Sequence, residues 1–388
     1  MVRKIAFIFL IFSFFNNICA QTTAKIDQIK INSKELNQKR EFFVFTPTIY
    51  STSPYSYYDV IYVFDAQNRE LFDYTHSIIS FLSNTSKNYI VVGIISPYYE
   101  KQDYGRNNDM LPVLQSEESK KRYGKYSGNA DNFLKYVKNE VVPYVEANYR
   151  TLSHRTAVGH SLSASFILYS MFNAPELFDN YIAISPNFAF DNGRLVKDLS
   201  RFDFNTIKTT QYLYVSNADE GIDYWQEWKP AREKAHSFLN DSLKSDNIKV
   251  VIKDFSSETH WSTFPPSLNF ALTYYFNQIS EQQQNELSTA EYEVTILVKV
   301  PNKNDELYIT GNQTSLGNWN PGLVKMTKKS DFEREIKVKL HSPAQFKFTK
   351  GSWDTEAEVK NGEMQNLTIK PEKQQKYKFE IVKYNQTN

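Results

Sequence analysis

The sequence predicts two folded units: a doubly wound, mostly parallel α/β sheet followed by a small all-β sandwich. First, β-branched runs alternate with amphipathic segments over about residues 25–279, as in sheets covered by helices on both faces. Second, the polar segment 281–285 interrupts this alternation. Third, the sequence from residue 291 onward consists of short strands and turns with no convincing helix.

The expected strands of the first unit are rich in β-branched residues, as buried parallel strands are. Residues 59–65 and 89–95 are two such runs, and the amphipathic segment 69–82 between them predicts a crossover helix. Residues 132–149 carry a helical stripe of apolar side chains despite Pro143. Further strands are expected at 156–159, 181–185, 211–216 and 248–255. One helix is expected after the strand at 156–159 and ends at residue 172, and two more are expected at 230–243 and 267–279. In the second unit, strands are expected at 292–300, 306–310, 332–340, 344–349 and 377–382.

The N-terminal segment has the pattern of a secretory signal peptide. Arg3 and Lys4 precede an apolar run over residues 5–15, and Ala20 ends a small-residue cleavage site. Cys19 is the only cysteine, so its removal would leave no disulfide and no thiol nucleophile. We therefore expect a signal peptide at 1–20, the α/β domain at 21–280, a linker at 281–290 and the sandwich at 291–388. The mature protein is expected to be exported, and to be periplasmic, surface-associated or secreted.

The composition argues against several classes of partner. The 45 basic and 44 acidic residues give a net charge of +1, so there is no electrostatic reason to expect nucleic acid or an anionic membrane. No segment after the first twenty residues is long and apolar enough for a transmembrane anchor. No histidine or cysteine cluster has metal-ligand spacing, and there is no glycine-rich phosphate loop. Neither a metal nor a cofactor is therefore expected.

The segment Gly159-His-Ser-Leu-Ser163 lies between a short expected strand and an expected helix. This is the setting of the nucleophile elbow of α/β-hydrolases, which needs small residues two positions on either side of the serine. Gly159 meets this need, and Ser163 replaces the usual second glycine. Ser161 is therefore the candidate nucleophile, and the N–H of Leu162 is a candidate oxyanion donor. The alternative is that Ser161 or Ser163 simply caps the helix.

A serine nucleophile needs a base, and α/β-hydrolases place their residues in the order serine, acid, histidine. Three of the six histidines follow Ser161. His236 falls within an expected helix and His341 within the β-rich tail. His260 lies in the loop between a strand and the last helix, where the fold delivers its base, and is therefore the candidate.

The acid is expected in the loop after the strand at 211–216. Asp219 and Glu220 both lie there, and a carboxylate at this place would orient the imidazole and stabilise its protonated form. We favour Asp219, with Glu220 as the close alternative. The second oxyanion donor is expected in the loop after the strand ending at Asp65, from the N–H of Ala66 or Gln67.

Over about residues 32–279 the sequence resembles an esterase family of α/β-hydrolases. That family groups siderophore esterases, feruloyl and acetylxylan esterases, S-formylglutathione hydrolase and mycolyl transferases. The matching segments follow the family's order: 40–47 (REFFVFTP), 60–65 (VIYVFD), 105–112 (GRNNDMLP), 128–134 (GNADNFL), 143–150 (PYVEANYR), 184–192 (ISPNFAFDN), 258–262 (ETHWS) and 265–268 (PPSL). The resemblance implies Ser161 and His260 as catalytic residues. Ser163, and Phe188 and Phe190 in place of tryptophan, depart from the family's pattern.

The tail resembles the starch-binding carbohydrate modules. The segments that carry this resemblance are 294–301 (VTILVKVP), 307–312 (LYITGN), 315–321 (SLGNWNP) and 346–348 (FKF). The resemblance implies that Trp319 stacks on sugar rings, with Trp353 as a second stacking residue and Lys347 beside them. The Asn-Arg pair that usually follows the second tryptophan is not evident, and the alternative is that the tryptophans cover the sandwich core.

Together these observations predict an exported serine carboxylic ester hydrolase that acts on an acylated carbohydrate or a similar small-molecule or glycan ester. The resemblance equally allows a siderophore ester such as a cyclic triester. Two alternatives belong to other classes, namely acyl transfer to an alcohol and a non-catalytic glycan-binding protein. The tail is expected to bind polysaccharide.

Overall fold

The structure of the protein is a computed structural model that describes residues 24–82, 87–97, 105–124, 126–243, 245–283, 285–362 and 366–385. The predicted signal peptide at 1–20, including Cys19 and Ala20, lies outside the described residues. Within the described ranges, no helix is long and apolar enough to cross a membrane.

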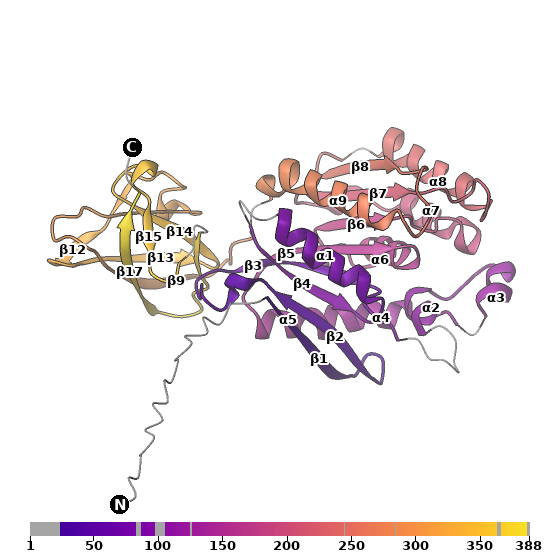
Figure 1. The fold of residues 1–388 in the computed structure, drawn as a ribbon, viewed down its shortest axis with the longest axis horizontal. Coiled ribbons are helices and arrows are strands. Elements are labelled where there is room, and N and C mark those ends of the chain that lie inside the picture. Colours follow the sequence, from indigo (N-terminus) through magenta and orange to yellow (C-terminus); the bar gives the residue numbers. More distant parts are fainter. Residues whose placement is uncertain are drawn as a thin grey trace, which may run out of the picture.

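Eight strands form the sheet of the N-terminal unit, in the order β1-β2-β4-β3-β5-β6-β7-β8 (Figure 1). They are β1 (Lys25–Ser33), β2 (Gln38–Thr46), β3 (Tyr58–Phe64), β4 (Tyr89–Ile94), β5 (Thr151–His160), β6 (Asn180–Ile184), β7 (Gln211–Asn217) and β8 (Ile248–Asp254). β2 is antiparallel to both β1 and β4, and all pairs from β4 to β8 are parallel. The predicted mostly parallel α/β sheet is therefore confirmed.

The order of the strands creates a crevice at one end of the sheet. β3 and β5 are neighbours, and the chain leaves them in opposite directions, to β4 and to β6. Because β-α-β crossovers are right-handed, the helices after β3 and β5 lie on opposite faces. Ligands of open α/β sheets bind at such a switch point, at the carboxyl ends of the strands. The loops that follow Phe64 and His160 meet there.

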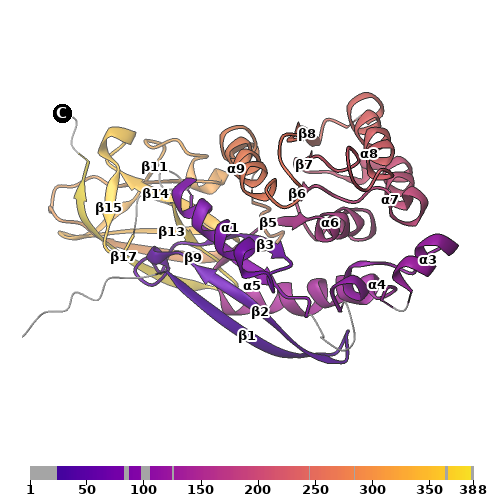
Figure 2. The ribbon, with the colours of Figure 1, turned by 45° about the vertical axis from the view of Figure 1, so that its right-hand side comes forward.

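Helices cover both faces of the sheet (Figures 1 and 2). One face packs on α1 (Arg69–Leu82) and α9 (Phe264–Tyr274). The other face packs on a larger group: α2 (Gly105–Met110), α3 (Glu117–Tyr123), α4 (Ala130–Tyr136), α5 (Val142–Asn148), α6 (Leu162–Asn173), α7 (Phe190–Arg201) and α8 (Trp228–Ser237). Burial of these apolar faces is the main favourable term in folding such a domain.

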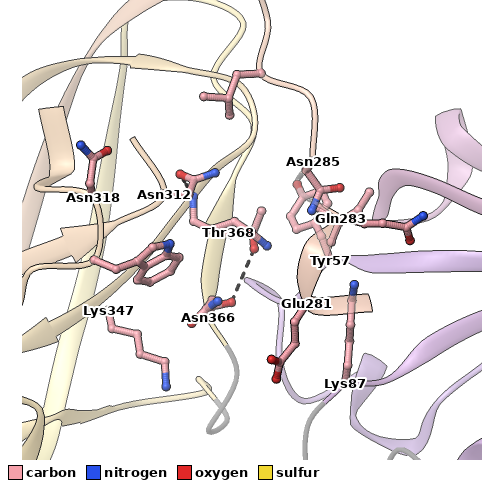
Figure 3. A pocket seen from close by; sticks show the side chains of 14 residues that line it. Tyr57, Lys87, Glu281, Gln283, Asn285, Asn312, Asn318, Lys347, Asn366 and Thr368 are labelled. Carbon is pink, nitrogen blue, oxygen red and sulfur yellow. Dashed lines mark hydrogen bonds between the residues drawn. The ribbon is translucent and has the colours of Figure 1, made fainter. Parts of the chain in front are cut away.

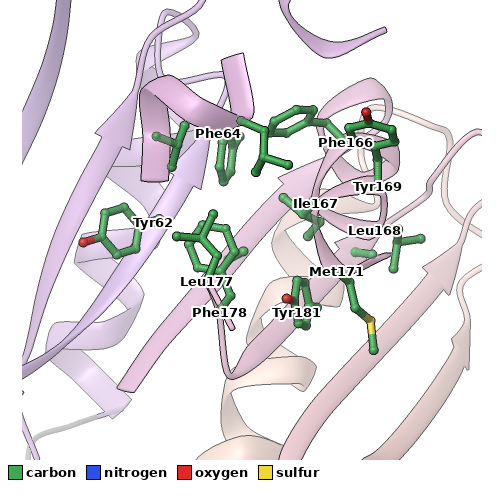
Figure 4. Packing of buried hydrophobic residues seen from close by; sticks show 14 of the residues in the cluster. Tyr62, Phe64, Phe166, Ile167, Leu168, Tyr169, Met171, Leu177, Phe178 and Tyr181 are labelled. Atoms are coloured by element: carbon green, nitrogen blue, oxygen red, sulfur yellow. The ribbon is translucent and has the colours of Figure 1, made fainter. Parts of the chain in front are cut away.

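α6 is the central helix of the larger layer, and it is apolar around most of its circumference. The ring of Phe166 lies 5.4 Å from that of Phe64 on β3, measured between centroids. Phe178, in the loop after α6, lies 5.7 Å from Tyr62 and 6.0 Å from Tyr181 (Figure 4). Packing this close holds the start of α6, and with it the turn at Ser161, firmly against the sheet.

The structure extends or divides several predicted elements. β5 has ten residues where a strand at 156–159 was expected. The expected helix at 132–149 contains a π turn at Val137–Val141, directly before Pro143, whose missing N–H an unbroken α-helix does not accommodate. The sequence did not predict β1, α2, α3 or α7. Strand β1 is mostly exposed at the edge of the sheet, where its polar residues limit further strand pairing.

The C-terminal unit is a sandwich of two sheets, as predicted. One has the order β11-β10-β14-β16 and the other β12-β13-β9-β17-β15. The strands are β9 (Glu291–Lys299), β10 (Tyr308–Gly311), β11 (Val324–Lys325), β12 (Thr327–Ser330), β13 (Glu333–His341), β14 (Ala344–Thr349), β15 (Ala357–Val359), β16 (Leu367–Ile369) and β17 (Gln375–Tyr384). Inward-facing side chains such as Ile296, Phe346 and Phe379 fill the space between the sheets. The sandwich lies beside the end of the large sheet where the parallel strands begin (Figure 1).

A buried ion pair joins the edge of the sheet to α2. The guanidinium of Arg40 on β2 donates to both carboxylate oxygens of Asp109, at 2.7 and 2.8 Å, and both side chains are almost fully buried. This contact accounts for the aspartate of the segment 105–112 that carries the family resemblance.

We expect Arg40→Met to lower the free energy of unfolding of the α/β domain by about 3–5 kcal/mol, because it leaves a buried carboxylate without its partner. Chemical denaturation followed by circular dichroism measures this. The double variant Arg40→Met/Asp109→Leu should recover most of the loss, and Lys120→Ala, which breaks an exposed pair with Glu117, should change the free energy by less than about 1 kcal/mol. An equal effect of Arg40→Met and Lys120→Ala would contradict the expectation.

Candidate active site

Ser161 occupies a strained turn between β5 and α6. Its backbone has φ 61° and ψ −120°, a conformation that L-residues rarely adopt outside functional turns. A Cβ at Gly159 would lie 2.5 Å from the backbone carbon and oxygen of Ser163, so only glycine fits there. The Ser163 hydroxyl accepts from the His160 N–H at 2.9 Å and donates to the His160 carbonyl at 2.8 Å. The serine that replaces the usual second glycine therefore closes the turn.

His260 and Glu220 form a buried pair in the crevice. The Nδ1 of His260 lies 2.5 Å from Oε1 of Glu220, and both side chains are almost fully buried. The second carboxylate oxygen accepts from the Ala218 N–H at 2.8 Å and lies 3.6 Å from the guanidinium of Arg232. Burial alone would raise the pKa of Glu220, but the hydrogen bond and charge of His260 outweigh it and lower the pKa. Glu220 is therefore held as a carboxylate.

The two candidate acids differ in what they contact. Asp219, which the sequence analysis favoured, is partly exposed and accepts a hydrogen bond from the hydroxyl of Tyr224. The same tyrosine oxygen accepts from the His260 N–H at 3.2 Å. Asp219 thus supports the loop that carries the histidine, whereas Glu220 contacts the imidazole itself.

Nε2 is the ring nitrogen of His260 that Glu220 does not contact. His260 Nε2 is buried and has no hydrogen-bond partner among the residues that the structure describes. The neighbouring residue of the turn, His160, donates from Nε2 to the His260 carbonyl at 2.7 Å, and the two imidazole rings lie 4.7 Å apart. The base and the serine turn are therefore in direct contact through His160.

The candidate oxyanion donors differ in whether their N–H groups are already used. The N–H of Leu162 is at the first position of α6, where no intrahelical acceptor is available. The N–H of Ala66 is already used, because it donates to the Ile94 carbonyl at 2.9 Å between β3 and β4. The N–H of the next residue, Gln67, makes no hydrogen bond within the described part of the chain. Gln67, which was the other option, replaces Ala66 as the candidate.

A polar network holds the loop after β3 in place. Asp65 has a positive φ of 65° and forms two hydrogen bonds with Arg106, at 2.6 and 2.7 Å. Burial would raise the pKa of Asp65, but the charge and hydrogen bonds of Arg106 lower it. The side chain of Gln67 bridges Asp65 and the Ser96 N–H, at 2.8 and 2.9 Å. These contacts orient the backbone of Gln67 relative to the serine turn.

Three tryptophans surround His260, and sequence reasoning missed all of them. Ring centroids of Trp225, Trp228 and Trp261 lie 4.9, 5.5 and 5.4 Å from that of His260. Trp228 is buried, whereas Trp261 is 76% exposed. The clustering of Trp225 and Trp228 just after the acid, with Trp261 next to the histidine, was the available signal. Within the described residues, no group of three or more histidine, cysteine or acidic side chains could hold a metal ion.

The structure separates the predicted sugar-binding residues from this crevice. Trp319 and Lys347 line one cavity between the sandwich and the α/β domain. Trp353 is 43% exposed and is not among the residues that line this cavity. Lys347 pairs with Glu356 at 2.5 Å. The structure thus brings two of the three predicted residues together.

Comparisons with known proteins agree with this architecture. The family model described as "Putative esterase" matches residues 33–295, and that of the starch binding domain matches residues 291–380. Ferri-bacillibactin esterase BesA of Bacillus subtilis is 24% identical over 61% of this chain and 86% of its own length. Siderophore triacetylfusarinine C esterase of Aspergillus fumigatus is 32% identical over 38% of this chain and 59% of its own length.

Among solved structures, an IroE-like serine hydrolase from Shewanella oneidensis superposes with a TM-score of 0.56 over 65% of this chain and 80% of its own. At 22% identity this likeness concerns the fold alone. Because the esterase model spans more than half of the chain, the protein belongs to this esterase family, as a carboxylic ester hydrolase with a C-terminal starch-binding-like module.

Proposed function

We propose that the protein is a serine ester hydrolase in which Ser161 is the nucleophile, His260 the general base and Glu220 the acid that orients it. The observation that carries the proposal is the buried 2.5 Å contact between His260 Nδ1 and Glu220, beside a serine held in a strained strand-to-helix turn. A carboxylate in this position keeps the proton on Nδ1, which leaves Nε2 to accept one.

The reaction proceeds by two acyl transfers. Ser161 Oγ attacks the acyl carbon while its proton passes to His260 Nε2, and the N–H groups of Leu162 and Gln67 donate to the developing oxyanion. The C–O bond to the alcohol then breaks, and His260 returns the proton to the departing oxygen. Water then attacks the acyl carbon while its proton passes to His260. The bond between the acyl carbon and Ser161 Oγ breaks, His260 returns the proton to Ser161 Oγ, and the carboxylic acid is released.

For the substrate, we propose a small ester of the siderophore type. The relatives named above are siderophore esterases. In addition, the Trp319 cavity is lined by Leu152 near the start of β5, whereas Ser161 follows its other end. An extended strand of this length spans about 30 Å at ~3.3 Å per residue. A sugar ring stacked on Trp319 therefore cannot present its own acyl group to Ser161.

An acylated carbohydrate, which the sequence analysis preferred, is the second candidate and is supported by the starch binding domain. A non-catalytic role is a weaker candidate, since the pair of His260 and Glu220 beside the strained turn at Ser161 supports catalysis. Acyl transfer would use the same residues and differs only in the acceptor, an alcohol in place of water. We also retain export through residues 1–20 as a proposal, which mass spectrometry of the N-terminus of the native protein tests.

Variants of the two carboxylates test the assignment. Glu220→Gln should lower kcat for p-nitrophenyl acetate about 10³- to 10⁴-fold, because the imidazole loses its orientation and charge compensation. Asp219→Asn is the matched control and should lower it less than about tenfold. Ser161→Ala should abolish covalent labelling by a fluorophosphonate, mapped by peptide mass. Equal activity of Glu220→Gln and the wild type, or label on another residue, would exclude this triad.

The substrate class is tested by direct competition. Purified protein is given ferri-bacillibactin, a feruloylated oligosaccharide and an acetylated xylo-oligosaccharide, and products are separated by liquid chromatography and mass spectrometry. We expect kcat/KM for the siderophore to exceed that for either sugar ester at least about 100-fold. A preference for a sugar ester would reverse the order of the two candidates. Acylated sugar acceptors among the products would instead indicate acyl transfer.

His160 is kept neutral beside the base. Burial, with a further contribution from the charge of His260, lowers the pKa of His160 to about 4. In the unfolded chain the pKa of histidine is about 6.5, so the unfolded state binds the extra proton between these values. Stability from His160 is therefore present above about pH 6.5 and is lost as the pH falls toward 4.

We expect the wild type to lose about 2 kcal/mol more free energy of unfolding between pH 7 and pH 5 than His160→Gln loses. Denaturant titrations at the two pH values measure the difference. If both proteins lost the same free energy of unfolding between pH 7 and pH 5, His160 would not titrate in this way.

A further inference from the structure

A polar cavity of about 860 Å³ lies between the sandwich and the α/β domain (Figure 3). The sandwich contributes Trp319 and amide side chains such as Asn318, Gln345 and Asn366. Side chains of the α/β domain and of the segment that follows it face these across the cavity, among them Tyr57, Lys87 and Glu281. A sugar seated on Trp319 therefore meets groups from both units.

We propose that this cavity is a composite binding site for a neutral oligosaccharide, in which the α/β domain supplies one wall. The starch-binding model covers residues 291–380 only, so it does not include Tyr57, Lys87 or Glu281. The proposal concerns this second wall and is independent of the esterase reaction.

The lining suits sugar hydroxyls rather than an acidic ligand. Amide and hydroxyl groups both donate and accept hydrogen bonds, as sugar hydroxyls do. The two lysines of the lining are already compensated, Lys87 by the buried Asp59 and Lys347 by Glu356. With Glu281 as the remaining charge, the described part of the lining has no excess of positive charge that would favour a carboxylate or phosphate.

Some side chains of the lining are hydrogen-bonded to other protein groups, and others are free to bond to a ligand. Asn312 and Asn285 are engaged: Asn312 Oδ1 accepts from the Gln345 N–H at 2.9 Å, and Asn285 Oδ1 accepts from the Ser153 hydroxyl at 3.0 Å. By contrast, the side chains of Gln345, Asn366 and Glu281 and the hydroxyl of Tyr57 make no hydrogen bond with any described residue. These four groups come from both sides of the cavity. The aromatic residues Tyr57 and Trp319 also lie on opposite sides of the cavity, Tyr57 in the α/β domain and Trp319 in the sandwich.

Contacts on two sides of the cavity hold the walls in register. On one side, the Thr368 N–H donates to the Tyr55 carbonyl at 2.8 Å, and the Tyr55 ring packs 4.7 Å from that of Phe379 in the sandwich core. On the other, Ser288 exchanges two backbone and hydroxyl hydrogen bonds with Ser342, at 2.7 and 2.9 Å. The predicted linker at 281–290 also contacts the α/β domain, since Gln283 donates to the Thr210 carbonyl at 2.8 Å and Asn285 accepts from the Ser153 hydroxyl at 3.0 Å. It is therefore bound to both units, and a pre-arranged site costs less ordering when it binds.

Isothermal titration of the full chain with maltoheptaose tests the proposal. We expect Trp319→Ala to weaken binding at least about 30-fold. Tyr57→Ala and Glu281→Ala should each weaken it about three- to tenfold, because each removes a hydrogen-bonding or stacking group of the second wall. Glu286→Ala, an exposed change in the same segment outside the cavity lining, is the matched control and should bind like the wild type.

Loss of binding in Trp319→Ala with unchanged binding in Tyr57→Ala and Glu281→Ala would overturn the composite site, since the sandwich would then bind alone. Absence of wild-type binding to maltoheptaose, cellohexaose and laminarihexaose would overturn it as well. So would preferential binding of an acidic oligogalacturonate. Thermal melting of each variant establishes that the two units remain folded, so that a folding defect is not taken for a lost contact.

Discussion

The turn that joins β5 to α6 is the constraint on which the rest of the catalytic unit depends. A residue with φ 61° is stable there only because the surroundings leave it no alternative. Gly159 allows the strand to approach the helix, Ser163 closes the loop with two hydrogen bonds, and the buried rings on α6 hold the helix to the sheet. The turn places the side chain of Ser161 at the carboxyl edge of the sheet, where the loops after β3, β7 and β8 converge.

Around this turn the domain keeps its polar groups in compensated pairs. The pairs Arg40 with Asp109 and His260 with Glu220 are buried, the pair Arg106 with Asp65 is partly buried, and each pair links segments far apart in the sequence. A buried charge without its partner is costly, so these pairs specify which loop meets which. The pairs Arg106 with Asp65 and His260 with Glu220 lie at the site. The geometry of the site therefore depends on the same contacts that fix the loops of the α/β domain.

Much of this was predictable because it depends on local pattern. Alternation of β-branched runs with amphipathic helices indicated the sheet, and chain order together with the small residues around Ser161 selected His260. The choice between Asp219 and Glu220 was not predictable, since the two carboxylates are adjacent in a turn. It depends on contacts between loops: the Tyr224 hydroxyl donates to Asp219, whereas the Ala218 N–H and the guanidinium of Arg232 lie at Glu220. The hydrogen bond of the Ala66 N–H was not predictable for a similar reason, because its acceptor is a carbonyl on the neighbouring strand. The three tryptophans belong to loops whose path no periodic pattern reveals.

The placement of the sandwich at the beginning of the parallel strands determines how the protein would be oriented if its tail held it on a polysaccharide. A chain attached through its tail to an insoluble glucan would direct the opposite end of the sheet, with its crevice, toward the bulk solvent. Diffusing molecules would reach that mouth without competing for space with the matrix. Attachment would then immobilise the catalyst without obstructing it, much as an enzyme coupled to a resin by the face remote from its active site keeps its turnover.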